Sequence, residues 1–227
     1  MPFNLPRATK ILLIANVVVF LLQWLFAAGQ MAIFELWPIG AGQFGDDIPS
    51  FWPWQLVTSG FMHDNFGHLF FNMLALVMFG APVEHLWGER RFLTYFLACQ
   101  VGAAFCHLAF ATWSFEMRQE IFSAVGASGG VYGLVLAYGL LFPHQKAAIF
   151  PIPMLLSART VAIMYGVFAL GYGVFGTAGG VRPLPHLGGM LVGWLLIRYW
   201  RGQPPFGVPH LGGFELPLAR RIEVTDI

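Results

Sequence analysis

Two polar side chains at the openings of separate hydrophobic stretches could together carry out acyl transfer. Ser128 lies in Gly126-Ala127-Ser128-Gly129 at the start of one stretch, and His186 opens another. Polar and ionisable groups inside a membrane span cost free energy, so their presence there indicates a functional site. A serine hydroxyl within hydrogen-bond reach of an imidazole forms a nucleophile with its general base. We therefore predict that Ser128 is the nucleophile and His186 its base.

A third hydrophobic stretch begins with side chains that could stabilise the charge such a nucleophile creates. His68 and Asn72 are four residues apart, so on a helix they share one face. Donor groups that face Ser128 would bind a tetrahedral oxyanion, together with the backbone N–H of Ser128 itself. The alternative is a hydrogen bond between helices that takes no part in chemistry. His63 precedes this stretch, and we expect it to buttress the adjacent outer loop.

Carboxylates are scarce in the hydrophobic stretches, which limits the kinds of catalytic site that the chain can hold. We expect no carboxylate near the histidines, and we interpret Glu84, near the inner end of its stretch, as structural. The prediction is therefore a Ser-His dyad rather than a triad. A metal site of His63, His68 and His186 is a weaker alternative, since the chain has no His-Glu-x-x-His motif. No Asp lies inside a stretch, as an aspartyl protease would require.

The composition is that of a membrane protein. Of the 227 residues, 57% are hydrophobic and 10% are charged, whereas soluble domains average about 25% charged residues. The net charge of +1 gives no electrostatic footprint for nucleic acid, so we expect no nucleic-acid partner. The bilayer itself is the expected surroundings of most of the chain.

Six stretches are apolar over a length that can cross the hydrocarbon core, which takes about 20 residues. They cover residues 11–28, 66–87, 92–114, 124–142, 157–176 and 184–200. The expected fold is an all-α membrane protein, a bundle of six transmembrane helices. Residues 1–10 would form a cytoplasmic N-terminus, 11–200 the membrane domain and 201–227 a cytoplasmic C-terminal tail. The first stretch is too long for the hydrophobic part of a signal peptide and is expected to remain in the membrane.

The distribution of Lys and Arg predicts the orientation of this bundle. One side of it carries Arg7, Lys10, Arg90, Arg91, Lys146, Arg159, Arg198, Arg201, Arg220 and Arg221. The other side carries Arg118 and Arg182. By the positive-inside rule, the first side and both termini are cytoplasmic. The second, fourth and sixth stretches then enter from the outer side, so His68, Ser128 and His186 lie at a similar shallow depth. The active site would open to the outer face.

Glycines accompany both members of the predicted dyad. They are Gly126, Gly129, Gly130 and Gly133 in one helix, and Gly189 and Gly193 in the other. Small residues at such spacings let two membrane helices approach closely. We expect them to bring the Ser128 hydroxyl within hydrogen-bond reach of the His186 imidazole.

These motifs and their order resemble those of the rhomboid family of intramembrane serine proteases. The matching residues are His63, His68 and Asn72 in the form His-x4-His-x3-Asn, Gly126-Ala127-Ser128-Gly129, and His186-Leu187-Gly188-Gly189 through Gly193. The resemblance covers roughly residues 11–200. It implies the six-helix fold, no cofactor, and a Tyr132 side chain that stacks on the catalytic imidazole. Gly80-x3-Glu84-x3-Gly88 is similar to a structural motif of the family's second helix.

One position departs from the family pattern. Many members carry a Trp-Arg pair in the first outer loop, whereas this chain has Trp54-Gln55. The missing positive charge puts the rigidity of that loop, or its lipid contacts, in question.

Together these features predict an intramembrane serine endopeptidase that cleaves single-span membrane proteins near the outer end of their transmembrane helix. The expected location is a multi-pass position in a bacterial inner membrane, and no metal is expected. The main alternative is a non-catalytic relative that binds membrane helices without cutting them, although retention of both Ser128 and His186 counts against it. A channel or proton pathway is less consistent, because the polar groups stop at shallow depth instead of crossing the bilayer.

Overall fold

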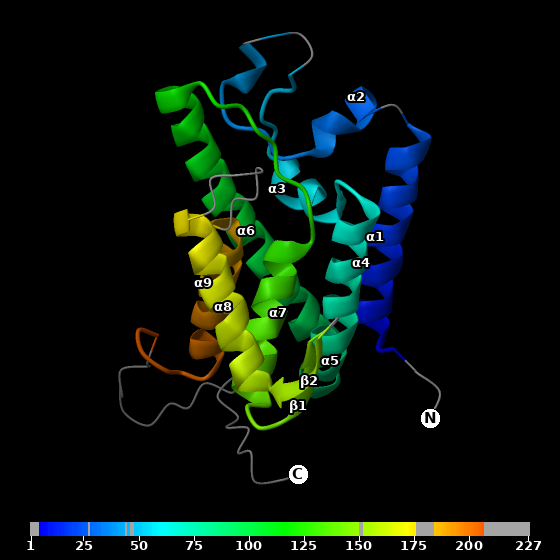
Figure 1. Ribbon diagram of the computed structural model, residues 1–227, viewed down its shortest axis with the longest axis vertical. Coiled ribbons are helices and arrows are strands. Elements are labelled where there is room, and N and C mark those ends of the chain that lie inside the picture. Colours follow the sequence, from blue (N-terminus) through cyan, green and yellow to red (C-terminus); the bar gives the residue numbers. More distant parts are fainter. Residues whose placement is uncertain are drawn as a thin grey trace, which may run out of the picture.

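The computed structural model describes residues 5–26, 28–43, 45, 48–149, 152–175 and 184–206, and most of these belong to helices (Figure 1). The longer helical units are α1 (Arg7–Leu25), α4 (Phe66–Ala75) continued by the π-helical η4 (Leu76–Gly80) and α5 (Ala81–Trp87), α6 (Glu89–Arg118), α7 (Ser128–Leu141), α8 (Ala158–Phe175) and α9 (Leu184–Trp200). The short elements are α2 (Ala28–Met31), η1 (Ala32–Phe34), η2 (Ala41–Gln43), α3 (Gln55–Thr58), η3 (Ser59–Phe61), β1 (Lys146–Ile149) and β2 (Ile152–Ser157). The predicted tail beyond residue 206 lies outside the described residues.

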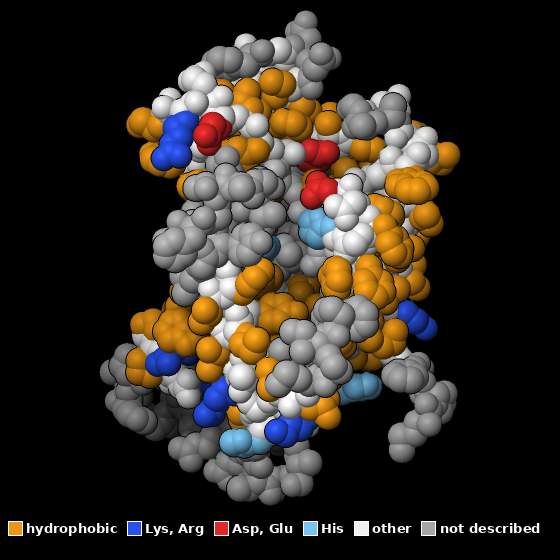
Figure 2. All heavy atoms as spheres, viewed as in Figure 1, with side chains coloured by type: hydrophobic (Ala, Val, Ile, Leu, Met, Phe, Trp, Pro, Cys, Tyr) orange, Lys and Arg blue, Asp and Glu red, His pale blue; other side chains and the backbone are white. Residues whose placement is uncertain are grey.

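The length and surface of the helices are those of a membrane protein. α1, the continuous unit from α4 to α5, and α6 are each long and apolar enough to cross a bilayer, with mean hydropathies of 1.9, 1.6 and 1.5. α7 and the apolar part of α8, Ala158–Phe168, are shorter. Figure 2 shows apolar side chains over much of the surface in this view. Among the exposed ones, Trp24 is 81% exposed. Exposed apolar surface of this extent marks contact with a membrane. The chain is therefore a mostly helical integral membrane protein, and six crossings remain a prediction.

Two local features differ from the predicted all-α plan. β1 and β2 pair as an antiparallel hairpin, where the sequence predicts only a connection between helices. The sequence also predicts helix from residue 124, but α7 begins at Ser128. Gly126 has a φ of +120°, outside the helical region, and Ala124 pairs with Leu36 in an isolated β-bridge. The segment before Ser128 is therefore extended and turned, not helical.

The charged side chains divide between the two ends of the molecule. Figure 2 shows most Lys and Arg side chains toward the lower end and the acidic side chains toward the upper end. In the same view α1 begins at the lower end, and α6 rises from there to the upper end (Figure 1). This separation of charge is the pattern on which the predicted orientation rests.

Glycines set the separation between α6 and the two helices packed on it, α7 and α9. A Cβ atom on Gly133 would lie 2.4 Å from Cys99 Sγ, and one on Gly193 would lie 2.4 Å from Tyr95 Oη. The buried Tyr95 hydroxyl donates to the Gly133 carbonyl oxygen at 2.8 Å. Gly130 and Gly133 thus pack on α6, whereas Gly189 of α9 packs on Gly129 of α7. A side chain at these positions would force the helices apart.

Glu84 joins the second helical unit to the start of the first. Its Oε1 accepts the Ala8 N–H at 2.8 Å, and its Oε2 accepts both the N–H and the hydroxyl of Thr9 at 2.7 Å. The first N–H groups of a helix have no partner within the helix, and a carboxylate there also complements the helix dipole. Glu84 is buried, so this single side chain satisfies donors that water would otherwise have to reach. Its role is structural, as the sequence predicts.

We predict that Glu84→Gln lowers the free energy of unfolding in detergent by about 2–4 kcal/mol, because an NH2 group, which cannot accept, replaces one of the two oxygen atoms that each accept a buried N–H. Glu89→Gln is the matched control. Glu89 also contacts the start of α1, through Arg7 at 3.7 Å, but both side chains are substantially exposed. Glu89→Gln should lower the free energy of unfolding by less than about 1 kcal/mol. Equal losses from the two changes would contradict the special role of Glu84.

Candidate active site

The structure brings Ser128 and His186 together from two different helices. Ser128 is the first residue of α7, His186 lies in the first turn of α9, and His186 Nε2 is 2.9 Å from Ser128 Oγ. The approach depends on two glycines beside them. A Cβ atom on Gly189 would lie 2.3 Å from the Gly129 carbonyl oxygen, so only glycine permits this backbone contact. The pair has the geometry that a serine nucleophile and its general base require.

Tyr132 fixes the plane of the His186 ring. The two rings are parallel within 2°, and their centroids are 4.3 Å apart. Tyr132 lies four residues after Ser128 on α7, so both side chains project from the same face of that helix. Tyr165 of α8 supports the stack from outside, edge-on to Tyr132 with centroids 5.5 Å apart. The imidazole is thereby held by aromatic packing on one side and by the Ser128 hydroxyl at Nε2.

His68 and Asn72 meet at the turn that leads into Ser128. A Cβ atom on Gly126 would lie 2.7 Å from His68 Nε2 and 3.7 Å from Asn72 Nδ2. With its φ of +120°, Gly126 has both a backbone conformation and surroundings that favour glycine. The two nitrogen atoms therefore lie beside the backbone two residues before Ser128.

A carboxylate holds the far side of the His68 ring. His68 Nδ1 lies 3.2 Å from Asp64 Oδ2, and the Asn65 side chain accepts the His68 N–H at 2.9 Å as the cap of α4. The prediction that no carboxylate lies near the histidines is wrong at this position. The spacing of Asp64 and His68, four residues apart, could have revealed the pair. Asp64 turns Nε2 of the ring toward Gly126.

His63 supports this arrangement without contacting Ser128. His63 is 2% exposed, and its ring lies edge-on to the His68 ring, with centroids 5.0 Å apart. Gln23 of α1 binds the His63 backbone on both sides, accepting its N–H at 3.0 Å and donating to its carbonyl oxygen at 3.2 Å. Burial, and secondarily the charge of His68, lowers the pKa of His63 to about 4. The ring is therefore neutral near pH 7, and its contacts agree with the predicted buttressing role.

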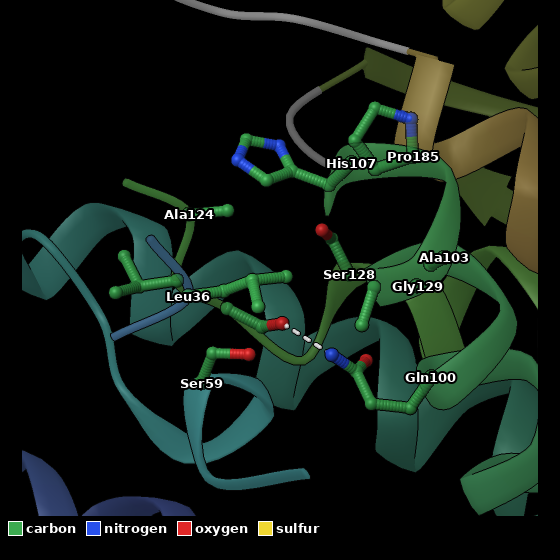
Figure 3. Close-up of a pocket in the computed structure, with 12 residues that line it drawn as sticks. Leu36, Ser59, Gln100, Ala103, His107, Ala124, Ser128, Gly129 and Pro185 are labelled. Atoms are coloured by element: carbon green, nitrogen blue, oxygen red, sulfur yellow. Dashed lines mark hydrogen bonds between the residues drawn. The ribbon is translucent and has the colours of Figure 1, made fainter. Parts of the chain in front are cut away.

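Gln100 of α6 is a site residue that the sequence reasoning missed. Its Nε2 donates to the Gly126 carbonyl oxygen at 3.2 Å, and its Oε1 accepts the Gly130 N–H at 3.0 Å (Figure 3). The Gly126 N–H in turn donates to the Ser59 carbonyl oxygen at 2.9 Å. One buried amide thus clamps the turn that carries Ser128 from both sides. A glutamine in the middle of an apolar helix is a costly polar group, and that signal could have identified it.

A small cavity adjoins Ser128. It has a volume of about 40 Å³, and the Ser128 hydroxyl points into it (Figure 3). Its wall includes Leu36 and Ala124 of the outer segments and His107 of α6. This volume is sufficient for at least one water molecule when polar partners are present. Among the residues that the structure describes, no three His, Cys, Asp or Glu side chains form a group that could hold a metal ion.

The comparison with known proteins identifies the family. Residues 51–202 match the family model described as the Rhomboid domain, and this span contains Ser128, His186, His68 and Asn72. The chain belongs to the rhomboid family.

Individual rhomboid relatives are similar at modest identity. Rhomboid protease GluP of Bacillus subtilis is 28% identical over 206 residues, which are 84% of this chain and 36% of that protein. Rhomboid protease AarA of Providencia stuartii is 26% identical over 202 residues, 83% of this chain and 70% of that protein. Mitochondrial Rhomboid protein 1 of Saccharomyces cerevisiae is 29% identical over 144 residues, which are 62% of this chain and 40% of that protein. The chain therefore spans less than half of the length of GluP and of the yeast protein.

Gln55, where many rhomboids have an arginine, forms hydrogen bonds within the first outer loop. Gln55 is fully buried and binds three backbone groups. Its Oε1 accepts the Trp37 N–H at 3.2 Å, and its Nε2 donates to the carbonyl oxygens of Ile33 and Ser50 at 3.1 Å. The loop is thus anchored without a charge. The neighbouring Trp54 remains 44% exposed, as an interfacial tryptophan would be.

We predict that Gln100→Leu slows covalent labelling of Ser128 by a fluorophosphonate about 10- to 100-fold, because the turn that positions the hydroxyl loses its clamp. The same change should lower the free energy of unfolding by about 2–4 kcal/mol, since Gly126 and Gly130 lose buried partners. Labelling is measured below the melting temperature of each variant.

Gln55→Leu is the control, because it removes an equally buried amide that also binds backbone groups but does not touch the turn. Gln55→Leu should lower the free energy of unfolding but keep the labelling rate within about twofold of the wild-type rate. This change is much smaller than the slowing expected for Gln100→Leu. Equal slowing in both variants would show that Gln100 acts only through stability.

Proposed function

We propose that this rhomboid is an intramembrane serine endopeptidase that uses Ser128 and His186 as a catalytic dyad. The observation that carries the proposal is the 2.9 Å contact between His186 Nε2 and Ser128 Oγ at the start of two adjacent helices. Membership of a family that includes proteins named rhomboid proteases gives independent support.

The chemistry follows from the atoms in reach. His186 Nε2 takes the Ser128 proton as Oγ attacks a peptide carbonyl carbon, and the carbonyl oxygen becomes an oxyanion. His68, Asn72 and the Ser128 backbone N–H stabilise that oxyanion. His186 then gives the proton to the leaving amine as the peptide bond breaks and an acyl-enzyme remains. Water attacks the acyl-enzyme with His186 again as base, which restores the free hydroxyl and releases the new carboxyl end. The cavity beside Ser128 offers that water a place next to the ester.

The proposed position in the membrane combines the charge distribution with the depth of the site. α7 begins part-way along the molecule, below the upper ends of α1 and α6 (Figure 1). With six crossings through residues 11–200 and both termini in the cytoplasm, Ser128 would open to the outer face. Residues 1–10 and 201–227 would then be cytoplasmic, and the membrane would be a bacterial inner membrane. No metal or nucleic acid takes part in this proposal.

The proposed substrates are single membrane spans, cut near their outer end. A closed helix shields its carbonyl groups in internal hydrogen bonds, so Ser128 cannot attack until a short segment unwinds. Gly or Pro lowers the cost of unwinding by about 1 and 3 kcal/mol relative to Ala. A shallow site admits only the outer part of a span, where such residues would favour cleavage.

A non-catalytic relative that binds membrane helices is the competing proposal, and the reactivity of the dyad separates the two. We predict that Ser128→Ala and His186→Ala each abolish cleavage of a single-span substrate by the purified protein. The double variant should be no worse than either single one, because the two groups act as a unit. Cleavage products are measured by mass spectrometry in proteoliposomes.

Ser123→Ala is the matched control for that experiment. Its hydroxyl donates to Glu35 Oε2 at 2.6 Å in the outer segments, away from His186, so its loss should leave cleavage intact. Turnover by Ser128→Ala would end the serine-protease proposal, and a wild-type protein that binds the substrate without cutting it would favour the alternative.

We predict that Asn72→Ala lowers kcat about 10- to 1000-fold with little change in KM, since an oxyanion donor acts mainly in the transition state. Asn16→Ala is the control, because Asn16 is also a buried amide in a helix but binds the Leu12 carbonyl oxygen of its own α1. It should leave kcat unchanged. A raised KM at constant kcat would make Asn72 a substrate-binding or packing residue instead.

A further inference from the structure

Arginine and tryptophan side chains form a cluster where the start of α6 meets the end of α9. We name Trp87, Arg91, Trp200 and Arg201 the inner basic cluster. The Arg91 guanidinium carbon lies 4.3 Å from the centroid of the Trp200 ring and 5.8 Å from that of Trp87. The two indole rings meet edge to face, with centroids 5.4 Å apart and planes at 83°. Two aromatic surfaces therefore hold one guanidinium group in a fixed position.

The cluster has an excess of positive charge. Arg201 lies close enough for its charge to oppose that of Arg91. Across the described part of the chain, the ion pairs are Arg7 with Glu89 and His68 with Asp64, so neither arginine of the cluster has an acidic partner there. The nearby carboxylates are already engaged, Glu84 by the start of α1 and Glu89 by Arg7.

The way in which Arg91 is held leaves it suited to an anion. Stacking uses the faces of the planar guanidinium group, whereas its N–H groups project from the edge and remain able to donate. Those donors form a fork that matches two oxygen atoms of a phosphate group. A second arginine close by would add charge to the same anion and relieve the repulsion between the two.

The location indicates which anion this would be. The cluster lies at the end of the helices that carries most Lys and Arg side chains, and tryptophan favours the headgroup level of a bilayer. Basic pockets between helix ends on that side bind the headgroups of anionic lipids. We propose that the inner basic cluster binds the phosphate group of an anionic phospholipid. This site lies apart from Ser128 and does not depend on the proposed protease activity.

The test uses the purified full chain in a neutral detergent. Dioleoylphosphatidylglycerol, dioleoylphosphatidylcholine and inorganic phosphate are titrated separately, with the melting temperature and the bound lipid measured by thermal scanning and native mass spectrometry. We expect saturable stabilisation by the phosphatidylglycerol alone. Arg91→Gln should weaken its binding about tenfold or more, because the stacked fork of donors is lost.

Arg90→Gln is the matched control. It removes the same charge from the adjacent, exposed residue, which makes no stacking contact among the described side chains. Arg90→Gln should change the affinity for the phosphatidylglycerol by no more than about twofold relative to wild type. The loss of a specific charged hydrogen bond would weaken binding far more. If Arg91→Gln does not fold, Arg201→Gln carries the same expectation, since Arg201 is exposed beyond the end of α9.

Three outcomes would overturn the proposal. Equal losses from Arg90→Gln and Arg91→Gln would show only a diffuse attraction of charge. Equal stabilisation by phosphatidylcholine, which also carries a phosphate group but has no net charge, would show that the cluster does not select an anionic lipid. Saturable binding of inorganic phosphate that displaces the phosphatidylglycerol would assign the site to a free anion instead of a lipid.

Discussion

The direct contact between the backbones of α7 and α9 is the constraint on which the site depends. At Gly129 and Gly189 there is no space for a side chain, because a Cβ atom on Gly189 would lie 2.3 Å from the Gly129 carbonyl oxygen. In lipid, where apolar side chains gain little by leaving the bilayer, such close van der Waals contact is a main source of helix association. The same contact sets the distance between Ser128, which directly precedes Gly129, and His186, which lies three residues before Gly189. The packing of the fold and the geometry of the proposed dyad therefore come from one feature.

Three buried polar side chains in this apolar chain satisfy the backbone of another segment of the fold. Glu84 does so at the start of α1, Gln55 within the first outer loop and Gln100 at the turn before α7. An unpaired backbone group in a low-dielectric interior costs free energy comparable to a lost hydrogen bond. Each of these side chains allows a non-helical or terminal segment to lie within the fold. The segment that Gln100 holds also carries Ser128, the proposed nucleophile, so the same hydrogen bonds stabilise the fold and position the hydroxyl.

Residue types, spacing and apolar length predict much of this arrangement. They place the long helices to within a few residues, and the Gly-x-Ser-Gly motif with a histidine on a later helix indicates which side chains meet. The start of α7 could not be predicted, because apolar length does not reveal that Gly126 takes a φ of +120° or that Ala124 pairs with Leu36. The roles of Gln55 and Gln100 also depend on backbone partners far along the chain, which no local pattern encodes. The pairing of Asp64 with His68 is different, since its four-residue spacing was available in the sequence.

Among the side chains that the structure describes, no acid pairs with His186, and the stacked ring of Tyr132 supports the imidazole instead. In a triad, a carboxylate orients the imidazole and stabilises the imidazolium that forms during attack. Here the parallel ring of Tyr132, with its centroid 4.3 Å away, orients the His186 imidazole through contact area. The face of an aromatic ring also attracts a cation, so the stack favours the ring once it has accepted the serine proton. Tyr132 lies four residues after Ser128, so the helix repeat places both side chains on one face of α7. Both therefore contact His186, the Ser128 hydroxyl at Nε2 and the Tyr132 ring at the face of the imidazole. A neutral support of this kind suits a site inside a membrane. A buried carboxylate beside His186 would carry a negative charge that needs a positive partner or hydrogen-bond donors even while the imidazole is neutral.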